Sequence, residues 1–338
     1  MEKLTDEYPY NKKHTRHQAN RLAEIEGYLS GFWRRPALVL GSARAVIYHT
    51  VKHFGLKRQD HILVPDFLCQ SILNILNTTS FPVKYPDERT RAVLVFHQWG
   101  YPQKMDEVMG EAKRRGFIVV EDCAHAFDSK YKGRLVGTFG DAAVFSFAKM
   151  FPTYLGGVLL SENEELMRHV SKERQLRNNF SNRLFNFFAF KIAKRSFEKG
   201  KSRFWLDLIY LKSIHYLNVG KKALEFLPSD ITAFTRGLSA RRANYLYLRG
   251  AIRREYLIPD WEDDIEANPI LMPVFLPSEK LPAASQTLLK AGILAEVLHF
   301  DVNRNVFAAN YRKCLAIPCH QEIEKEQLSL IAETINRI

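Results

Sequence analysis

The sequence predicts an α/β protein with a mainly parallel central sheet, followed by a smaller α+β unit. Short strand-like segments alternate with helical ones from residue 36 to residue 161. The strands are apolar along their whole length, as in a parallel sheet covered by helices on both faces. The length of 338 residues suggests about two domains, and the hydrophobic fraction of 46% is ordinary for a folded globular chain.

The alternating region divides into strands and helices that can be placed in order. The strands are expected at residues 36–41, 61–65, 92–97, 117–122, 142–147 and 157–161. The helices between them are expected at residues 43–55, 69–78 and 104–115. In the last of these helices, Met105, Val108 and Ala112 share one face, and Gly116 follows the helix as a stop signal. The pattern predicts βαβ units with right-handed crossovers.

The remainder of the chain predicts a small C-terminal α+β unit. Residues 228–258 have the pattern of one long helix, and residues 321–337 have that of a closing helix. We expect a large domain over residues 1–235 and a small domain over residues 236–338. The strand-like runs of the small domain are PILMPVFLP (269–277) and LAEVLHF (294–300).

Residues 180–217 combine aromatic side chains with a dense stretch of lysine and arginine. One interpretation is a pair of amphipathic helices that pack on the large domain or at a dimer interface. The other is a basic, aromatic surface that makes a peripheral contact with a membrane or another anionic partner. The whole chain has 49 Lys and Arg against 37 Asp and Glu, a net charge of +12, which suits an anionic partner of some kind.

Several classes of protein are not expected. The sequence has no run of 18 apolar residues to span a membrane, and its first residues, MEKLTDEYPYNKKHTRH, do not resemble a secretory signal. The scattered cysteines fit a reducing, cytoplasmic location. Cys314, Cys319 and His320 match no zinc spacing, so no metal site is predicted. No recognition-helix pattern is evident, so nucleic-acid binding is not expected.

Reactive side chains follow two of the predicted strands, where ligands bind in open α/β sheets. Asp122 ends the strand 117–122, where its carboxylate either holds a cation or caps the following turn. Lys149 follows the strand 142–147. A lysine that is partly desolvated at such a position has a lowered pKa and can act as an amine nucleophile.

A third candidate is the turn between the first strand and the first helix of the alternating region. Ser42 and Ala43 are small, so backbone N–H groups at this helix N-terminus can approach a phosphate, and Arg44 can add charge. A carboxylate, a lysine and a phosphate cradle at the strand ends of one sheet are the parts needed to hold pyridoxal 5′-phosphate. The sequence therefore predicts this cofactor.

Residues 120–160, VEDCAHAFDSKYKGRLVGTFGDAAVFSFAKMFPTYLGGVLL, resemble the DegT/StrS family of pyridoxal-phosphate-dependent sugar aminotransferases. Weaker resemblance extends along nearly the whole chain, including GSARAVIY (41–48), PSDITAFTRGLSARRANY (228–245) and CLAIPCHQEIEKEQLSLIAETINRI (314–338). The resemblance implies the fold type I aminotransferase architecture and a homodimer.

The resemblance also assigns roles to individual positions. Lys149 matches the Schiff-base lysine, and Asp122 matches the acid that pairs with the pyridine nitrogen. The other cofactor-binding positions are His125 beside the ring, Ser146, Arg44 and Ala45 at the phosphate, and Cys69 where many members place a stacking aromatic ring.

The chain departs from the common pattern of the family at several of these positions. Two fewer residues separate Ser146 from Lys149 than in common members. Cys69 cannot stack on a ring, so stacking falls to His125 or is absent. Residues 221–230 contain no match for an Asn that the neighbouring subunit often supplies. These differences are also consistent with a divergent branch of the family.

The resemblance implies transfer of an amino group from an amino acid, expected to be glutamate, to a nucleotide-linked keto sugar. Lys149 would also act as the general base of the proton shift. The diphosphate of such a substrate would give part of the positive charge a partner. One alternative is sugar dehydration on the same fold, although a His replaces the lysine in those relatives. Another is a non-catalytic binding or regulatory homologue.

Overall fold

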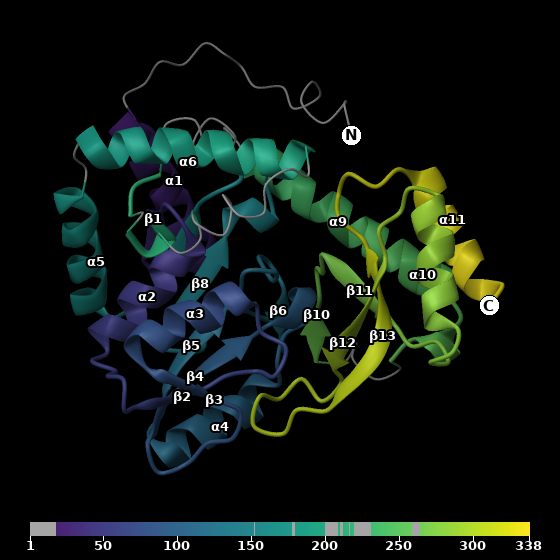
Figure 1. Ribbon diagram of the computed structural model, residues 1–338, viewed down its shortest axis with the longest axis horizontal. Helices are drawn as coiled ribbons and strands as arrows, with labels where there is room; N and C mark the ends of the chain where they lie inside the picture. Colours follow the sequence, from purple (N-terminus) through teal and green to yellow (C-terminus); the bar gives the residue numbers. More distant parts are fainter. Residues whose placement is uncertain are drawn as a thin grey trace.

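The computed structural model describes most of the chain. The described residues are 18–151, 153–177, 180–199, 209, 212–215, 217–219, 231–258 and 264–338. Figure 1 shows a larger part built around the main sheet and, beside it, a smaller part formed by the C-terminal strands and helices.

A seven-stranded sheet in the order β1-β9-β8-β5-β4-β2-β3 forms the centre of the larger part. Its strands are β1 (Ala37–Leu40), β2 (His61–Leu63), β3 (Phe81–Val83), β4 (Thr90–Phe96), β5 (Ile118–Asp122), β8 (Ala142–Ser146) and β9 (Gly157–Leu160). Neighbours from β3 to β8 pair in parallel, whereas β9 pairs antiparallel with both β8 and β1. The mainly parallel sheet predicted from the sequence is therefore confirmed.

Three helices that connect these strands occupy the predicted segments: α2 (Ala43–His53), α3 (Gln70–Thr79) and α4 (Met105–Arg115). A further helix after β9, α5 (Glu164–Leu176), was not predicted. Helix α4 buries Met105, Val108 and Ala112, and it ends at Gly116, whose φ of 68° is left-handed. Glycine adopts that conformation without the steric cost that a Cβ would bring, which explains the stop.

Some elements of the larger part have no signature in the sequence pattern. Helix α1 (Gln18–Trp33) packs Leu29 and Trp33 into a core cluster beside β1 and β8. Strand β3 has only three residues, Phe-Pro-Val, so its apolar run is too short to indicate a strand by itself. A small second sheet joins β6 (Lys130–Tyr131) and β7 (Arg134–Leu135) to β10 (Ile265–Glu266), far along the chain.

The smaller part contains a three-stranded sheet in the order β11-β13-β12. Its elements are β11 (Leu271–Val274), α10 (Leu281–Lys290), β12 (Glu296–Asp301), β13 (Tyr311–Pro318) and α11 (Lys325–Asn336). Apolar side chains of both helices and all three strands belong to one core cluster. The pattern does not predict β13, because Arg312 and Lys313 in its first half are exposed. The domain boundary after residue 235 stays a prediction.

The long helix α9 (Ile231–Ala251) contributes to the core cluster of the smaller part. It ends earlier than the predicted residue 258, and the chain continues into the one-turn helix η4 (Arg254–Tyr256).

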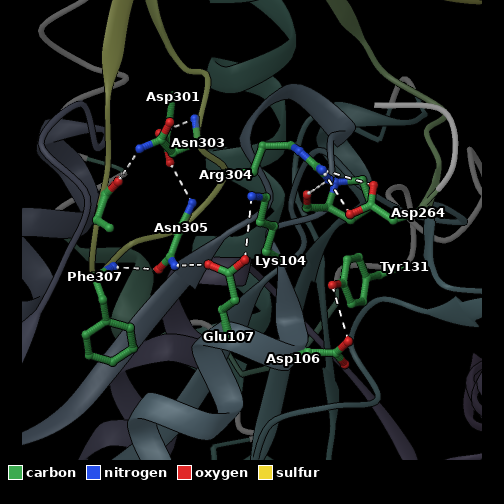
Figure 2. Close-up of polar contacts among 12 residues, drawn as sticks. Lys104, Asp106, Glu107, Tyr131, Asp264, Asp301, Asn303, Arg304, Asn305 and Phe307 are labelled. Atoms are coloured by element: carbon green, nitrogen blue, oxygen red, sulfur yellow. Dashed lines mark hydrogen bonds and ion pairs between the residues drawn. The ribbon is translucent and has the colours of Figure 1, made fainter. Parts of the chain in front are cut away.

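A loop of the smaller part lies against α4 of the larger part (Figure 2). Asp301 shapes this loop, because its carboxylate accepts hydrogen bonds from the backbone N–H groups of Asn303, Asn305 and Asn310 at 2.9 to 3.1 Å. The amide of Asn305 then donates to the carboxylate of Glu107 in α4 at 2.8 Å.

Arg304 holds the same loop from the other side (Figure 2). Its guanidinium donates to the carbonyl of Pro102 at 3.0 Å and to both oxygens of Asp264 at 2.9 and 3.1 Å, with the arginine side chain only 3% exposed. The backbone N–H of Lys104 donates to the carbonyl of Arg304 at 2.7 Å. The two parts are therefore joined by buried polar contacts as well as by chain connections.

Among the described residues of the segment 180–217, Phe180–Lys199 form helix α6 and Ser213–His215 form the one-turn helix η3. Helix α6 lies along one outer edge of the larger part (Figure 1). A second amphipathic helix was predicted here, and most of the residues between 200 and 211 lie outside the described ones. In the part of the chain that the structure covers, no helix has the length and apolarity to cross a bilayer.

Candidate functional site

The predicted site residues follow strands that all end at the same edge of the sheet. Strand β9 is antiparallel to both β1 and β8, so β1 and β8 point in the same direction. Strands β8, β5, β4 and β2 are parallel to one another. The segments that follow these strands are therefore gathered at one edge, as expected for a ligand site in an α/β sheet.

The start of β9 lies between the end of β1 and the end of β8 and pairs with both. Gly157 pairs with Leu40 on one side and with Ser146 on the other. The N–H of Gly156 donates to the carbonyl of Gly41 at 2.8 Å. A Cβ on Gly157 would lie 2.4 Å from the backbone nitrogen of Ala43, closer than atoms can approach. The glycine pair therefore lets the strand touch the turn after β1.

Asp122 is a buried carboxyl group at the end of β5. Burial raises its pKa to about 6, and a hydrogen bond from the N–H of Ala124 and the charges of His97 and Lys149 oppose this rise. The alternative that Asp122 caps its following turn is thus observed. The same carboxyl also lies within electrostatic reach of Lys149, so the structure brings these two predicted residues together.

Lys149 ends the one-turn helix η2 (Phe147–Lys149) after β8. Its side chain is exposed, so the desolvation expected from the sequence is not found, because the residue lies beyond the buried strand rather than within it. The ammonium group nevertheless affects His125. Burial lowers the pKa of His125 well below its usual value, and the charges of Lys149 and Arg241 lower it further. His125 is therefore neutral.

The Nδ1 atom of His125 is buried without a hydrogen-bond partner among the described residues. Its ring meets Phe96 edge to face at 5.2 Å. A buried polar atom without a partner is costly, so a group that hydrogen-bonds it would be stabilised there.

The turn after β1 is a helix N-terminus, as predicted, but its polar groups already have partners. Ser42 caps α2, because its hydroxyl accepts from the N–H of Ala45 at 3.1 Å. The same hydroxyl donates to the carbonyl of Ser213 in η3 at 3.1 Å. The Nε of Arg44 donates to the Ser213 hydroxyl at 2.9 Å. Helix η3 therefore lies against the predicted phosphate cradle of Ser42, Ala43, Arg44 and Ala45, a contact that the sequence did not indicate.

The two remaining predicted residues lie at the same edge without a defining contact. Ser146 is half-buried and precedes η2, and its side chain makes no capping hydrogen bond there. Cys69 is exposed before α3, where its Sγ lies 3.2 Å from the hydroxyl of Ser71. Phe67, two residues earlier, is 47% exposed and stacks on the His299 ring at 4.4 Å.

A buried network beside Asp122 was not predicted. The carboxylate of Glu121 accepts hydrogen bonds from His97 and from the backbone N–H groups of residues 137, 139 and 140. Burial raises the pKa of Glu121, but the hydrogen bonds and charge of His97 and the backbone bonds outweigh it, so the net pKa is lowered. Arg35 binds the carbonyls of Gly137, Gly140 and Asp141 in the same turn.

His97, Glu121 and Cys123 place three potential metal-ligand atoms within 4.8 Å of one another. The Nε2 of His97 faces Glu121, and its Nδ1 accepts from the N–H of Gln103 at 3.1 Å. Both ring nitrogens and both carboxylate oxygens are therefore engaged, and the arrangement is that of a structural network.

A second arrangement that sequence reasoning missed holds the residue after Lys149. The Nη1 of Arg241 lies 2.6 Å from the Sδ of Met150, and its Nη2 donates to Oε1 of Gln321 at 2.7 Å. The Gln321 amide in turn donates to the carbonyl of Met150 at 3.3 Å. Arg241 is 2% exposed. Helix α9 and the segment after β13 thus hold the lysine segment in place.

A hollow of about 720 Å³ lies on the outer side of α4. It is lined by Pro86, by α4 residues and by residues 305, 307 and 308, and none of the predicted site residues lines it. The candidate site is therefore the strand-end edge and not this hollow.

The residues at this edge fit pyridoxal phosphate. Asp122 offers a buried carboxyl for a protonated ring nitrogen, Lys149 offers an exposed amine, and the unpartnered Nδ1 of His125 offers a polar contact. The α2 N-terminus can take a phosphate through its backbone.

Comparison with known proteins agrees with this fit. Residues 86–187 match the sequence model of the DegT/DnrJ/EryC1/StrS aminotransferase family. GDP-perosamine synthase of Escherichia coli O157:H7 is 29% identical over 150 residues, which cover 38% of this chain and 41% of that protein. The spore coat polysaccharide biosynthesis protein SpsC of Bacillus subtilis is 32% identical over 150 residues, which cover 38% of this chain and 39% of that protein. The alignments thus span about two fifths of these curated relatives.

Solved structures resemble the chain over a greater length. The Spr1654 protein of Streptococcus pneumoniae in its PLP form has a TM-score of 0.68 and 18% identity, covering 94% of this chain and 90% of that one. PseC of Helicobacter pylori, an aminotransferase involved in the biosynthesis of pseudoaminic acid, has a TM-score of 0.65 and 18% identity, covering 95% and 91%.

The chain therefore has the fold of these solved structures, the α/β architecture of fold type I. Residues 86–187, about a third of the chain, carry the segment that matches the model of the DegT/DnrJ/EryC1/StrS aminotransferase family. The resemblance stated from the sequence is therefore confirmed.

Proposed function

We propose that the protein is a pyridoxal-phosphate-dependent aminotransferase that transfers an amino group from glutamate to a nucleotide-linked keto sugar. The observation that carries the proposal is the meeting of Lys149, Asp122 and His125 at one sheet edge, where the lysine charge acts on both other groups. The family match and the relatives named for sugar or polysaccharide biosynthesis support it.

Each residue of the site then has a definite task. When bound, pyridoxal phosphate supplies a carbonyl for the amine and a conjugated ring that accepts electrons. Lys149 Nζ would hold the cofactor and would move the proton as general base. Asp122 would keep a proton on the ring nitrogen. Neutral His125 would offer its contact to the ring, and the backbone of the α2 N-terminus, with Arg44 and Ser146, would hold the phosphate.

The proposal includes the setting in which the enzyme works. We propose a cytoplasmic homodimer with the domain boundary after residue 235. The Asn that a neighbouring subunit often supplies has no match in residues 221–230, which lie outside the described residues. A peripheral membrane contact through residues 180–217 is also proposed, and helix α6 is the part of that segment that supports it.

A non-catalytic homologue is the second candidate, and one observation favours it. Ser42 and Arg44, both expected at the phosphate, are hydrogen-bonded to Ser213. A sugar dehydratase is less well supported, because Lys149 occupies the position where a His is expected in those relatives.

The proposal is tested by trapping the cofactor on its lysine. The protein is incubated with pyridoxal phosphate and reduced with borohydride, and the labelled peptide is identified by mass spectrometry. We expect a near-visible absorbance band, a label on Lys149, and glutamate-dependent amination of a nucleotide-linked keto sugar. Lys149→Ala should abolish all three, whereas Lys172→Ala, which removes an exposed lysine of α5, should change none.

Two results would contradict the proposal. A colourless protein without a label would favour the non-catalytic homologue. A labelled protein that releases a deoxy sugar without amine transfer would favour dehydration.

A further inference from the structure

The outward face of α6 joins apolar side chains with cations. Leu184, Phe187 and Phe188 are 45%, 39% and 51% exposed. Lys191 and Arg195 are exposed as well. These residues follow one another at intervals of one, three or four positions, so they share one side of the helix. Large aromatic rings side by side at a surface mark an interaction site more often than single exposed ones do.

The opposite face of α6 fixes the helix to the protein. Ala189, Phe190 and Ala193 are buried, and Phe190 meets Tyr154 edge to face at 5.7 Å. The amide of Asn186 donates to the carbonyl of Asn218 at 2.9 Å. Helix α6 runs along the edge of the larger part (Figure 1). Because its inner face is buried, the exposed aromatic side chains lie on the opposite face.

A cation lies over one of the exposed rings. The Nζ of Lys191 lies 4.4 Å from the centroid of the Phe187 ring. The sequence from residue 191 to residue 203 contains six Lys or Arg and a single acid, Glu198. A rigid helix with aromatic rings flanked by cations is typical of helices that lie in the headgroup region of a membrane.

We propose that α6 is an interfacial helix that binds this protein to the surface of an anionic lipid membrane. Phe187 and Phe188 enter the headgroup region, and Lys191 and Arg195 bind lipid phosphates. This deepens the membrane contact included in the proposed function, and it does not depend on the aminotransferase chemistry.

Charge complementarity favours a lipid surface over a second copy of the chain. In a two-fold dimer the same face meets itself, so Lys191 and Arg195 of one copy would meet a face that carries the same cations. Like charges at an interface are unfavourable, whereas each cation near an anionic membrane is attracted to it. The second copy is therefore the alternative outcome of the test.

The test is cosedimentation of the full chain with lipid vesicles. We expect binding to vesicles that contain phosphatidylglycerol, little binding to pure phosphatidylcholine, and release as salt screens the charges. Phe187→Ser with Phe188→Ser should weaken the partition coefficient more than tenfold. Lys191→Gln and Arg195→Gln should each weaken it about fivefold. Leu294→Ser is the matched control, because Leu294 is 63% exposed in the smaller part, and it should bind as the wild type does.

Circular dichroism melting shows whether the double Phe variant is folded. If it is not folded, the vesicle binding of the two charge variants tests the proposal instead. Wild-type protein that stays in the supernatant with anionic vesicles at low salt overturns the proposal. Charge variants that bind as well as the wild type overturn it too. If the vesicles are not bound and the Phe variant turns a dimer into a monomer in sedimentation velocity, the face is a subunit interface. Cofactor labelling of Lys149 is measured in a separate experiment. A failure of the membrane proposal can therefore be told apart from a failure of the aminotransferase proposal.

Discussion

At the scale of single residues, Asp122 shows how the site is prepared for a cationic ligand. Its carboxyl is buried, and its pKa is raised to about 6 because burial disfavours the charged form. A protonated ring nitrogen beside it would reverse that effect. The same burial that makes the free carboxylate costly therefore strengthens its attraction for such a group.

Asp122 should leave a pH signature on the stability of the cofactor-free protein. The carboxyl has an ordinary pKa of 3.8 when unfolded and about 6 when folded, so between these values the native state holds a proton that the unfolded chain has lost. Raising the pH through this window therefore destabilises the wild type, by about 3 kcal/mol in all. The asparagine side chain of Asp122→Asn does not titrate, so the variant escapes this loss. The free energy of unfolding of the variant minus that of the wild type should therefore be about 3 kcal/mol larger at pH 7 than at pH 4.

Urea unfolding of both proteins at the two pH values measures this difference. Glu121 and all other groups titrate in both proteins, so their contribution cancels in the difference between the two free energies of unfolding. An equal difference at pH 4 and pH 7 would show that the Asp122 carboxyl has an ordinary pKa in the folded protein.

The residues of the site divide into those that local sequence can indicate and those that it cannot. Lys149 and Asp122 directly follow apolar strands, and a strand end in an α/β sheet has a predictable place. Arg241, Gln321 and Ser213 come from helices and loops far along the chain. No local pattern marks them, because their positions depend on how the segments pack together.

At the scale of secondary-structure elements, the contact between β9 and α2 depends on a missing side chain. A methyl group on Gly157 would lie 2.6 Å from the Cα of Ala43, and both neighbours are backbone that cannot rotate away. Gly157→Ala should therefore destabilise the protein by about 3 kcal/mol, the upper end for overpacking.

Gly110 provides the matched control for this substitution. It lies within α4, and no atom comes within 4 Å of a Cβ added there. Gly110→Ala should stabilise the protein by about 1 kcal/mol, because alanine favours a helix more than glycine does. Both values come from urea unfolding. A Gly157→Ala protein as stable as the wild type would mean that β9 does not approach α2 so closely.

The elements themselves were predictable where burial is uniform along them. Every residue of β9 is buried, and its apolar run indicates a strand directly. The apolar run of β3 is only three residues long, and the first half of β13 has exposed charges, so neither indicates a strand directly. The predicted end of α9, residue 258, lies beyond its observed end at Ala251. The apolar pattern continues past Ala251 because η4 and the residues after it also pack into the core.

At the scale of the whole molecule, Arg304 joins the two parts. Its side chain is 3% exposed and binds both Asp264 and the carbonyl of Pro102. Arg304→Met would leave a partly buried carboxylate and a carbonyl without this donor. We expect a loss of about 3 kcal/mol in the free energy of unfolding.

Arg253→Met is the control for Arg304→Met. Arg253 pairs with Glu255 at 3.7 Å, and both side chains are more than half exposed, at 53% and 65%. Removing such a surface pair should change stability by less than about 1 kcal/mol. Similar losses in both variants would show that the buried contacts of Arg304 contribute little to holding the parts together.

The position of β9 has a mechanical consequence for the whole molecule. One strand separates the turn after β1 from the segment before Lys149, and both are paired to it residue by residue. Their separation is therefore set by backbone spacing, about 10 Å across two strand intervals. Because β1, β9 and β8 all belong to the larger part, a shift of the smaller part would leave this distance unchanged. Adjustment of the site is therefore left to the segments that cover this edge, such as those whose Arg241 and Gln321 contact Met150.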